Sequence, residues 1–485
     1  MTADHTSAGT FASKFAGAAP VSGDTIYALA SAPGRAGVAV IRVSGPAAGA
    51  VLLAVCGRAD LPAPRRALRV RLVDPAPGDG FGAALDDGLV LWFPGPASFT
   101  GEDVAEFHIH GGRATVEAVT GAISRLGASA DAARGDLGPV RLAAPGEFSK
   151  RAFLAGKIDL TGAEAIADLV DADTDAQRRQ ALAQLDGGLT ARLDAWRGRL
   201  VDILAHAEAW IDFPDEDLPA DVEDAAKARI AGLSGEIAAF LDDNRRGERL
   251  RDGLQVVLLG APNAGKSSLL NALASRDAAI VSDTAGTTRD VIEVHLDLGG
   301  WPVTLADTAG LRAAADGAGD IEQEGVRRAL DRAAAADLRL VVFDATRAPD
   351  AASRALLAGN AAGGTTIAVF NKSDLAADGP GEIDGQAALA ISAKTGDGLA
   401  ALLARIGDAA AALMEQGDGA PLTRLRHREA LTAAVEALDR AAAGADSELV
   451  AEDLRLAARA LGRVTGRVDV EDLLDVIFFD FCIGK

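Results

Sequence analysis

A glycine-rich loop stands directly after a buried-strand pattern, and this pairing constrains the fold more than any other feature of the sequence. Residues 254–259 form an apolar run, and the loop that follows reads Gly-Ala-Pro-Asn-Ala-Gly-Lys-Ser over 260–267. Helix-forming residues continue over 269–273. A strand, a Gly-x4-Gly-Lys-Ser loop and a helix in this order form a P-loop, whose backbone N–H groups and helix N-terminus surround phosphate oxygens. The sequence therefore predicts an α/β domain that binds a phosphorylated ligand.

A second motif in the same segment selects the base. Asn371-Lys372-Ser373-Asp374 follows the apolar run 366–370. The Asp374 carboxylate can accept hydrogen bonds from N1–H and the exocyclic amine of guanine, whereas adenine lacks this donor pair and would leave a buried carboxylate unpaired. Lys372 supplies a stem that can pack on the base, and the turn Ser392-Ala393-Lys394 can offer a backbone N–H to guanine O6. Together the two motifs predict a guanine-nucleotide site.

The order of the motifs assigns the remaining contacts to GTP and Mg²⁺. Lys266 is expected to reach the β- and γ-phosphates, and Ser267 and Thr288 to ligate Mg²⁺. Asp307 would hold Mg²⁺ through water, while the Gly310 N–H would sense the γ-phosphate. The predicted nucleotide contacts are Asn263, Ala264, Gly265, Lys266, Ser267, Ser268, Ser282, Asp283, Thr284, Ala285, Gly286, Thr287, Thr288, Asp307, Thr308, Ala309, Gly310, Asn371, Lys372, Asp374, Ser392, Ala393 and Lys394.

One position departs from the Ras pattern. Leu311 follows Asp-Thr-Ala-Gly, where Ras-type enzymes have the glutamine that orients the attacking water. A leucine side chain cannot hold water. Catalysis must therefore recruit another polar group and another positive charge.

Composition excludes several other classes of protein. The chain has 485 residues and a formal net charge of −22. Phosphate neutralisation requires clustered Lys and Arg, so this balance argues against binding nucleic acid by bulk charge, while a local basic patch or a partner that carries the RNA stays open. Cys56 and Cys482 are too few for a disulfide scaffold and fit a reducing compartment. No apolar run reaches spanning length, so we expect a soluble, cytoplasmic protein without a membrane partner.

Changes of hydrophobic period divide the chain into five segments. Residues 1–23 lack periodicity and the charge pattern of a signal peptide, so we expect a disordered leader. Short apolar or alternating runs predict an α+β domain over 24–140. Helical spacing predicts an all-α part over 141–250, including one helix that begins near Leu182 and is interrupted after Asp212 by Pro214.

The second half of the chain returns to strands and then to helices. Apolar runs alternate with helical segments over 251–415, which is typical of a doubly wound α/β domain. Helical spacing continues over 416–485. We therefore expect an α/β P-loop domain inserted in an all-α helical domain, with a smaller α+β domain at the N-terminal side. The expected strands of the α/β domain are 254–259, 303–306, 338–343, 366–370 and 389–391.

Motifs outside the nucleotide site resemble one family. These motifs are Phe93-Pro94-x-Pro96-x-Ser98-Phe99-Thr100-Gly101-Glu102-Asp103, His110-Gly111-Gly112, Pro145-Gly146-Glu147-Phe148-Ser149-Lys150-Arg151, Ile211-Asp212-Phe213-Pro214 and Phe481-Cys482-Ile483-Gly484-Lys485. The P-loop segment is similar to TrmE/Era/EngA-type GTPases, and with these motifs the chain resembles the MnmE (TrmE) family over about 24–485. The resemblance implies a potassium-activated GTPase of tRNA modification. With the flavoprotein MnmG, such enzymes install an aminomethyl or carboxymethylaminomethyl group on C5 of the wobble uridine (position 34).

The resemblance also implies roles for individual residues of the GTPase centre. K⁺ would be held by Asn263, Ser282, Thr284 and Thr287. Glu322 would orient water and act in catalysis with Lys266 and Gly310, and Glu324 stays open as an alternative because the segment 311–321 is longer than the family's usual spacing.

In the N-terminal part, the resemblance implies a homodimer that binds 5-formyl-tetrahydrofolate or a related one-carbon folate through Arg42, Glu106, Lys157 and Lys485. Basic side chains suit the carboxylates of a glutamate tail, and a carboxylate suits a pterin edge. The residues alone favour a different interpretation of Arg42 and Glu106, as solvated strand positions. Cys482 is either a modification-site thiol or a small buried apolar residue.

A ribosome-assembly GTPase of the Era or EngA kind is the alternative function. Against it, the sequence has no second P-loop and no Gly-x-x-Gly clamp in a basic setting. Because the chain is acidic, we expect its own affinity for tRNA to be weak, with an MnmG-type FAD protein supplying the rest in a heterotetramer or larger complex.

Overall fold

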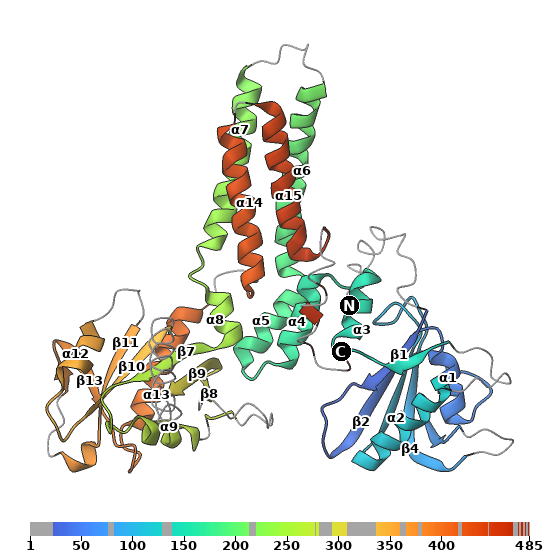
Figure 1. Ribbon diagram of the computed structural model, residues 1–485, viewed down its shortest axis with the longest axis horizontal. Coiled ribbons are helices and arrows are strands. Elements are labelled where there is room, and N and C mark those ends of the chain that lie inside the picture. The colour runs from blue at the N-terminus through green and yellow to red at the C-terminus, as the bar shows by residue number, and fades with distance from the viewer. Residues whose placement is uncertain are drawn as a thin grey trace, which may run out of the picture. The chain divides into compact units, whose positions relative to one another are not determined.

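The computed structural model describes residues 23–75, 82–128, 138–212, 220–276, 278–280, 293–307, 336–358, 365–376, 381–415, 420–444 and 446–468, and positions 474, 477–478, 481 and 484 (Figure 1). The chain divides into two compact units, Met1–Ala167 with Gly462–Lys485, and Asp168–Leu461. Each unit is described by itself below. No helix in the described part of the chain is both long enough and apolar enough to traverse a lipid bilayer.

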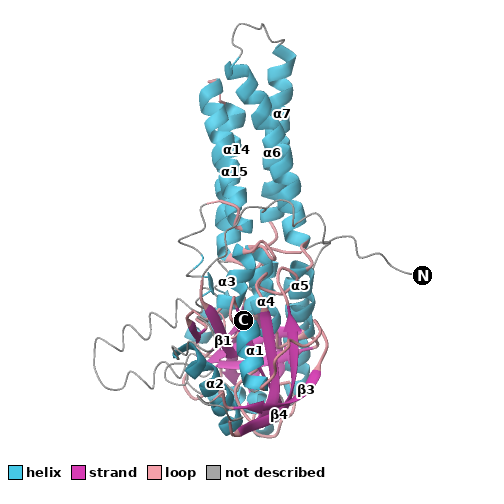
Figure 2. Cartoon of the chain, turned by 90° about the vertical axis from the view of Figure 1, so that its right-hand side faces the viewer, coloured by secondary structure: helices cyan, strands magenta, loops and turns pink. Residues whose placement is uncertain are grey.

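The first unit contains a six-stranded sheet in the order β3-β4-β5-β2-β1-β6, antiparallel except for the β1–β6 pair. Alternate residues of its strands face α1 and α2, which lie against the same side of the sheet (Figure 2). Ile41 and Phe107 from the sheet pack there with Leu52 and Ile123 from the helices. The elements are β1 (Thr25–Leu29), β2 (Ala36–Ser44), α1 (Ala48–Cys56), β3 (Leu68–Val73), β4 (Ala84–Phe93), β5 (Val104–Gly111), α2 (Arg113–Ala128), β6 (Val140–Leu142), α3 (Glu147–Leu154) and α4 (Leu160–Val170), whose end from Asp168 onward belongs to the second unit.

Helix α3 packs on the β1 end of this sheet. Phe148 is fully buried and contacts Ile26, Ala28 and Ala143. Gly146, at the N-terminus of α3, has φ +65°, and a Cβ added there would lie 2.6 Å from the carbonyl oxygen of Phe478. Within this unit, the backbone at Phe478 therefore lies close to the N-terminus of α3.

The second unit contains a seven-stranded sheet in the order β12-β13-β11-β10-β7-β9-β8, whose five inner strands are parallel and whose edge strands are antiparallel. Successive residues of the inner strands enter opposite core clusters, so both faces are buried. This confirms the predicted doubly wound α/β fold. The elements are β7 (Leu254–Leu259), α9 (Lys266–Ala274), β8 (Glu293–Leu298), β9 (Trp301–Asp307), β10 (Leu338–Asp344), α12 (Ala351–Ala358), β11 (Thr365–Asn371), η1 (Ser373–Leu375), β12 (Glu382–Ile383), β13 (Gln386–Ala390) and α13 (Leu399–Met414).

Helices on both sides of the α/β segment in sequence form a bundle, in which α6, α7, α14 and α15 lie side by side (Figures 1 and 2). The rings of Trp196 in α6 and Phe240 in α7 pack edge to face, with 5.4 Å between their centroids. Ser234 of α7 donates a hydrogen bond to Asp439 of α14 at 2.6 Å. The helices are α5 (Asp175–Leu185), α6 (Gly188–Asp212), α7 (Ala220–Leu241), α8 (Arg246–Asp252), α14 (Leu425–Ala443) and α15 (Ser447–Thr465).

One predicted helix is wrong. The apolar spacing from Leu182 through Trp196 predicts one continuous helix, but α5 ends at Leu185 and α6 begins at Gly188. Gly187 has φ +85°, in the left-handed region that ends helices. The apolar positions continue in register across the break, so hydrophobic periodicity alone conceals it.

The α/β segment enters and leaves the bundle at one place. Asp168 Oδ1, near the end of α4, accepts a hydrogen bond from Arg251 Nε at 3.0 Å and from Arg424 Nη2 at 2.6 Å. Arg251 lies just before β7 and Arg424 just before α14. A Cβ at Gly247 would lie 2.2 Å from the carbonyl oxygen of Leu422. The segments that lead into and out of the α/β segment are therefore in direct backbone contact.

Candidate guanine-nucleotide site

The loop between β7 and α9 has a backbone that requires glycine at both ends. Gly260 has φ +137°, and a Cβ there would lie 2.2 Å from the carbonyl oxygen of Val342. Gly265 has φ +92°, and its Cβ would lie 2.2 Å from Asn371 Nδ2. These are conformations and separations that an L side chain cannot share without strain. The loop therefore turns tightly at the carboxyl end of β7 and leads directly into the N-terminus of α9.

Lys266 begins α9 and folds back over this loop. Its ammonium donates to the carbonyl oxygens of Gly260 and Ala261 at 2.9 and 3.0 Å. The residue is only 8% exposed. A largely buried cation, a helix N-terminus and a glycine loop in one place form an environment that fits the phosphates of a nucleotide. Ser267 and Ser268 follow in the first turn of α9.

Asn371 joins three loops of the site. It is buried at the end of β11. Its Nδ2 donates to the Ala264 carbonyl at 3.0 Å, and its Oδ1 accepts from the Ala393 N–H at 3.0 Å. The phosphate loop, the Asn-Lys-Ser-Asp motif and the Ser392–Lys394 turn are thus held together by one amide side chain.

Asp374 is fixed by a hydroxyl and remains accessible. Ser392 Oγ donates to Asp374 Oδ1 at 2.7 Å, and Ser392 Oγ itself accepts from the Thr395 N–H at 3.1 Å. The Asp374 residue is exposed. The sequence analysis expects this carboxylate to be buried when guanine is bound. Because Asp374 is exposed here, the base itself would have to cover it.

The structure adds a residue that the sequence analysis missed. Lys372 Nζ donates to the Asn263 carbonyl at 2.9 Å and to Asp344 Oδ2 at 2.7 Å. Burial opposes ionisation of the Asp344 carboxyl, but hydrogen bonds from Lys372 and Thr346 outweigh it and lower its pKa to about 2. Asp344 is the last residue of β10, and its position at a strand end beside the P-loop strand was the available clue.

The other predicted residues of the nucleotide site are placed only by backbone register or lie outside the described part of the chain. Asp307 is the last residue of β9 and pairs in register with Leu258 of β7, which puts its backbone at the P-loop edge of the sheet. Several predicted residues lie outside the described part of the chain, namely Ser282, Asp283, Thr284, Ala285, Gly286, Thr287, Thr288, Thr308, Ala309, Gly310, Leu311, Glu322, Glu324, Cys482 and Lys485.

Known protein families and proteins match nearly the whole length of the chain. The MnmE helical-domain profile matches residues 160–482, and the profile of the GTP-binding protein TrmE N-terminus matches residues 25–157. The chain is 57% identical to the tRNA modification GTPase MnmE of Paramagnetospirillum magneticum, covering 95% of this chain and 100% of that protein. The chain belongs to the MnmE family.

Two further proteins match the chain, one over nearly all of it and one over about a third. The tRNA modification GTPase MnmE of Rhodospirillum rubrum is 56% identical, with 95% of this chain and 99% of that protein covered. Among solved structures, the G domain of the T. maritima FeoB iron transporter is 28% identical, with 32% of this chain and 98% of that chain covered, at a TM-score of 0.24. As a member of the MnmE family, the chain is a GTP hydrolase of the tRNA-modification type.

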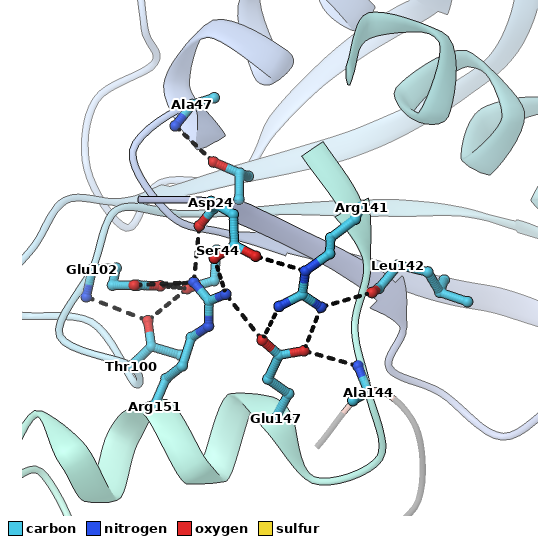
Figure 3. A network of polar contacts seen from close by, with 11 residues as sticks. Asp24, Ser44, Ala47, Thr100, Glu102, Arg141, Leu142, Ala144, Glu147 and Arg151 are labelled. Atoms are coloured by element: carbon cyan, nitrogen blue, oxygen red, sulfur yellow. Dashed lines mark hydrogen bonds and ion pairs between the residues drawn. The ribbon is translucent and has the colours of Figure 1, made fainter. Parts of the chain in front are cut away.

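The first unit contains a charge cluster centred on the buried Arg151 side chain (Figure 3). The Arg151 side chain is 3% exposed and donates to Asp24, Glu102 and Glu147 at 2.9–3.1 Å. Arg141 donates to Asp24 and Glu147 at 2.6 Å. We call these five residues the N-terminal charge cluster. It fastens α3 to the start of β1 and to the 94–103 loop, which gives the charges of this segment a structural role.

Arg42 and Glu106 form a second pair on adjacent strands of the same unit. Arg42 Nη2 lies 2.9 Å from Glu106 Oε1, and the two side chains are 24% and 16% exposed. The Arg42 guanidinium also lies 5.7 Å from the ring centroids of Phe99 and Phe148. The two residues lie on strands, as the residues alone suggest, but their side chains are half-buried and paired with each other rather than fully solvated. Lys157, by contrast, is exposed, and its Nζ donates to the Pro96 carbonyl at 2.8 Å.

Proposed function

We propose that this GTPase acts in modification of C5 of the wobble uridine of certain tRNAs, forming aminomethyl or carboxymethylaminomethyl groups together with an MnmG-type FAD protein. GTP hydrolysis would drive G-domain dimerisation and the accompanying conformational change. The observation that carries the proposal is the junction of phosphate loop and base-reading motif through Asn371, within a chain that matches MnmE relatives from end to end.

The nucleotide contacts follow from the chain's own groups. Lys266 is the cation that would meet the β- and γ-phosphates, and Asp374 the acceptor that would select guanine. Ser267 and Thr288 are the side chains that would hold Mg²⁺. The ion would neutralise charge on the phosphates when bound.

Potassium dependence is proposed from the family resemblance, and the absence of the usual water-orienting residue agrees with it. Leu311 cannot take that role, so Glu322, with Glu324 as its alternative, would orient water. Asn263, Ser282, Thr284 and Thr287 would hold K⁺, which would supply positive charge during hydrolysis. Of these four residues the structure describes Asn263, which has φ +64° within the phosphate loop and whose carbonyl accepts from Lys372.

A one-carbon folate site is proposed around Arg42 and Glu106. The pair combines a cation, a carboxylate and the Phe99 and Phe148 rings, which suit the acidic tail and the pterin edge of such a ligand. Lys157 contacts the neighbouring loop, and Lys485 would complete the set. The folate would supply a one-carbon unit when bound. We further propose a homodimer through the N-terminal domain and a cytoplasmic location, with Cys482 open between a reactive thiol and a packing residue.

Salt exchange tests the potassium part of the proposal. The purified full-length chain should hydrolyse GTP markedly faster in KCl than in NaCl at equal ionic strength. An intrinsic GDP affinity that is the same in both salts is the control for nucleotide binding. Equal hydrolysis rates in the two salts would contradict the potassium dependence.

Mass analysis of tRNA tests the modification itself. Cells that lack this chain should lose the C5 substituent at the wobble uridine, and the full chain should restore it. A Lys266→Ala variant should not restore it, because the phosphate cradle would be defective. Retention of the substituent in the deleted cells would contradict the proposal. No observation favours the ribosome-assembly alternative.

A further inference from the structure

Asp344 stands between two loops of the nucleotide site without belonging to either motif. It ends β10, which lies between β7 and β11 in the sheet. β7 leads into the phosphate loop and β11 ends in Asn371. Because parallel strands finish at the same edge of a sheet, β10 delivers Asp344 between the phosphate loop and the base-reading motif.

Both carboxylate oxygens of Asp344 are engaged. Oδ1 accepts from the Thr346 N–H at 2.9 Å and from Thr346 Oγ1 at 2.6 Å. Oδ2 accepts from Lys372 Nζ at 2.7 Å. Thr346 therefore fixes the direction of the carboxylate and leaves the second oxygen for the lysine.

Lys372 carries this constraint onward to the phosphate loop. The same ammonium donates to the Asn263 carbonyl at 2.9 Å. Asn263 has φ +64° and Lys372 has φ +67°, so both residues occupy the left-handed region that side chains other than glycine seldom adopt. Such backbone conformations persist where surrounding contacts hold them. The Lys372 ammonium links these two residues directly.

An ordinary surface ion pair would have little effect on function. The Asp344–Lys372 pair differs in two respects. The Asp344 side chain is 12% exposed and the Lys372 side chain 32%, so the pair is partly shielded from solvent. The lysine also has a second, main-chain acceptor in another loop, so that its position affects two segments that meet the nucleotide.

We propose that Asp344 is a positioning residue for guanine-nucleotide binding, holding the Lys372 ammonium so that the base-reading motif and the phosphate loop keep a fixed separation. The role rests on the assignment of the nucleotide site made above. Asp344 acts through Lys372 and does not contact the nucleotide.

A double-mutant cycle on GDP binding tests this role. Dissociation constants for a fluorescent GDP analogue are measured with the full chain as wild type, Asp344→Asn, Lys372→Met and the double variant. Replacing the charged acceptor should weaken binding about tenfold, as expected for one charge-assisted hydrogen bond. In the Lys372→Met background the same change should alter the dissociation constant by less than about twofold. Equal losses in both backgrounds would overturn the proposal.

Matched variants separate positioning from general stability. Asp384→Asn makes the same chemical change in the same sheet domain, at an aspartate that pairs with Arg354 at 3.5 Å in the turn between β12 and β13, and should leave GDP affinity unchanged. Thr346→Val removes the hydroxyl that orients Asp344 and should weaken binding less than Asp344→Asn does, whereas Thr346→Ser should restore it. If Thr346→Val binds GDP like the wild type, the proposal is wrong. This test holds also when Asp344→Asn does not fold. Failure of the wild type to bind GDP would instead remove the nucleotide-site assignment.

Discussion

The nucleotide site and the N-terminal charge cluster both bury basic side chains, and they hold them by different means. Lys266 donates to main-chain carbonyls of its own loop. Arg151 donates to three carboxylates, of which Asp24 and Glu102 come from distant parts of the sequence and Glu147 from the preceding turn of the same helix. Main-chain carbonyls carry only partial negative charge, so these two contacts do not neutralise the ammonium, which suits an anionic ligand. Carboxylates compensate a guanidinium within the protein, which suits a fastening between elements.

This difference predicts where each region is sensitive. The nucleotide site should respond to changes in backbone freedom and in ligand chemistry. The N-terminal charge cluster should respond to removal of charge and to acid.

The largest effect is expected from Asp374→Asn. The amide can no longer accept from both N1–H and the exocyclic amine of guanine, so GTP affinity should fall on the order of 10⁴-fold, as in other sites that lose a matched hydrogen-bond partner. Xanthine nucleotides should gain in preference. Competition binding with GTP and XTP measures the shift. An unchanged preference for GTP would remove the base-reading role of this motif.

The second effect concerns Arg151→Met. Removing a buried guanidinium leaves Asp24, Glu102 and Glu147 with less compensation, so the first unit should lose about 3–5 kcal/mol of stability. Hydrogen exchange of β1 and β2 peptides in rising urea measures this loss. Arg113→Met is the control, because Arg113 is 92% exposed in an i,i+4 pair with Glu117. A large fall in GDP affinity in Arg151→Met would break the separation drawn between the two regions.

The third effect is expected from Gly265→Ala. The added Cβ would meet Asn371 Nδ2 in a backbone conformation with φ +92°. Strain of about 3 kcal/mol in the nucleotide-binding loop corresponds to a loss of GDP affinity of about 100-fold. The same fluorescent GDP titration measures it. Gly198→Ala in α6, where nothing lies within 4 Å of the new Cβ, should leave GDP affinity unchanged.

The smallest effect is a dependence on acid. Burial opposes ionisation of the Glu147 carboxyl, but hydrogen bonds from Arg141, the Ala144 N–H and Arg151 outweigh it and lower its pKa below the ordinary value of 4.5. A carboxyl with a lowered pKa stabilises the fold above its unfolded-state pKa and loses that contribution as the pH falls through its folded-state pKa. The first unit should therefore weaken below about pH 4.5.

Urea unfolding of the first unit at a series of pH values measures this dependence. Glu147→Gln should be less stable near neutral pH and should show a shallower decline in acid. A decline of the same steepness in the variant would assign the acid sensitivity to other carboxyls.

The sequence predicts the two regions unequally, for a physical reason. The phosphate loop is readable because its geometry depends on residues within eight positions, two of them glycines. Arg151 and Asp24 are separated by 127 residues, and no local periodicity connects them. The family resemblance singles out Glu102, Glu147 and Arg151 as motif residues, but it does not predict that they contact one another.

Even within the nucleotide site, some residues escape prediction. An aspartate at the end of a strand, such as Asp344, is common, and only its register opposite Asn371 makes it significant. The helix break at Gly187 was missed because the apolar spacing continues across it. Sequence patterns identify loops that bind directly, whereas the residues that set the distances between loops become visible only in three dimensions.

The Asp168 junction has a consequence for the modularity of the chain. One carboxylate oxygen receives both Arg251 and Arg424, and the backbone at Gly247 touches that of Leu422. Domains whose two ends meet in this way are readily inserted or removed, because little loop-closure entropy is at stake. A linker of about four to six residues should therefore replace the whole GTPase segment and leave the helical bundle able to close.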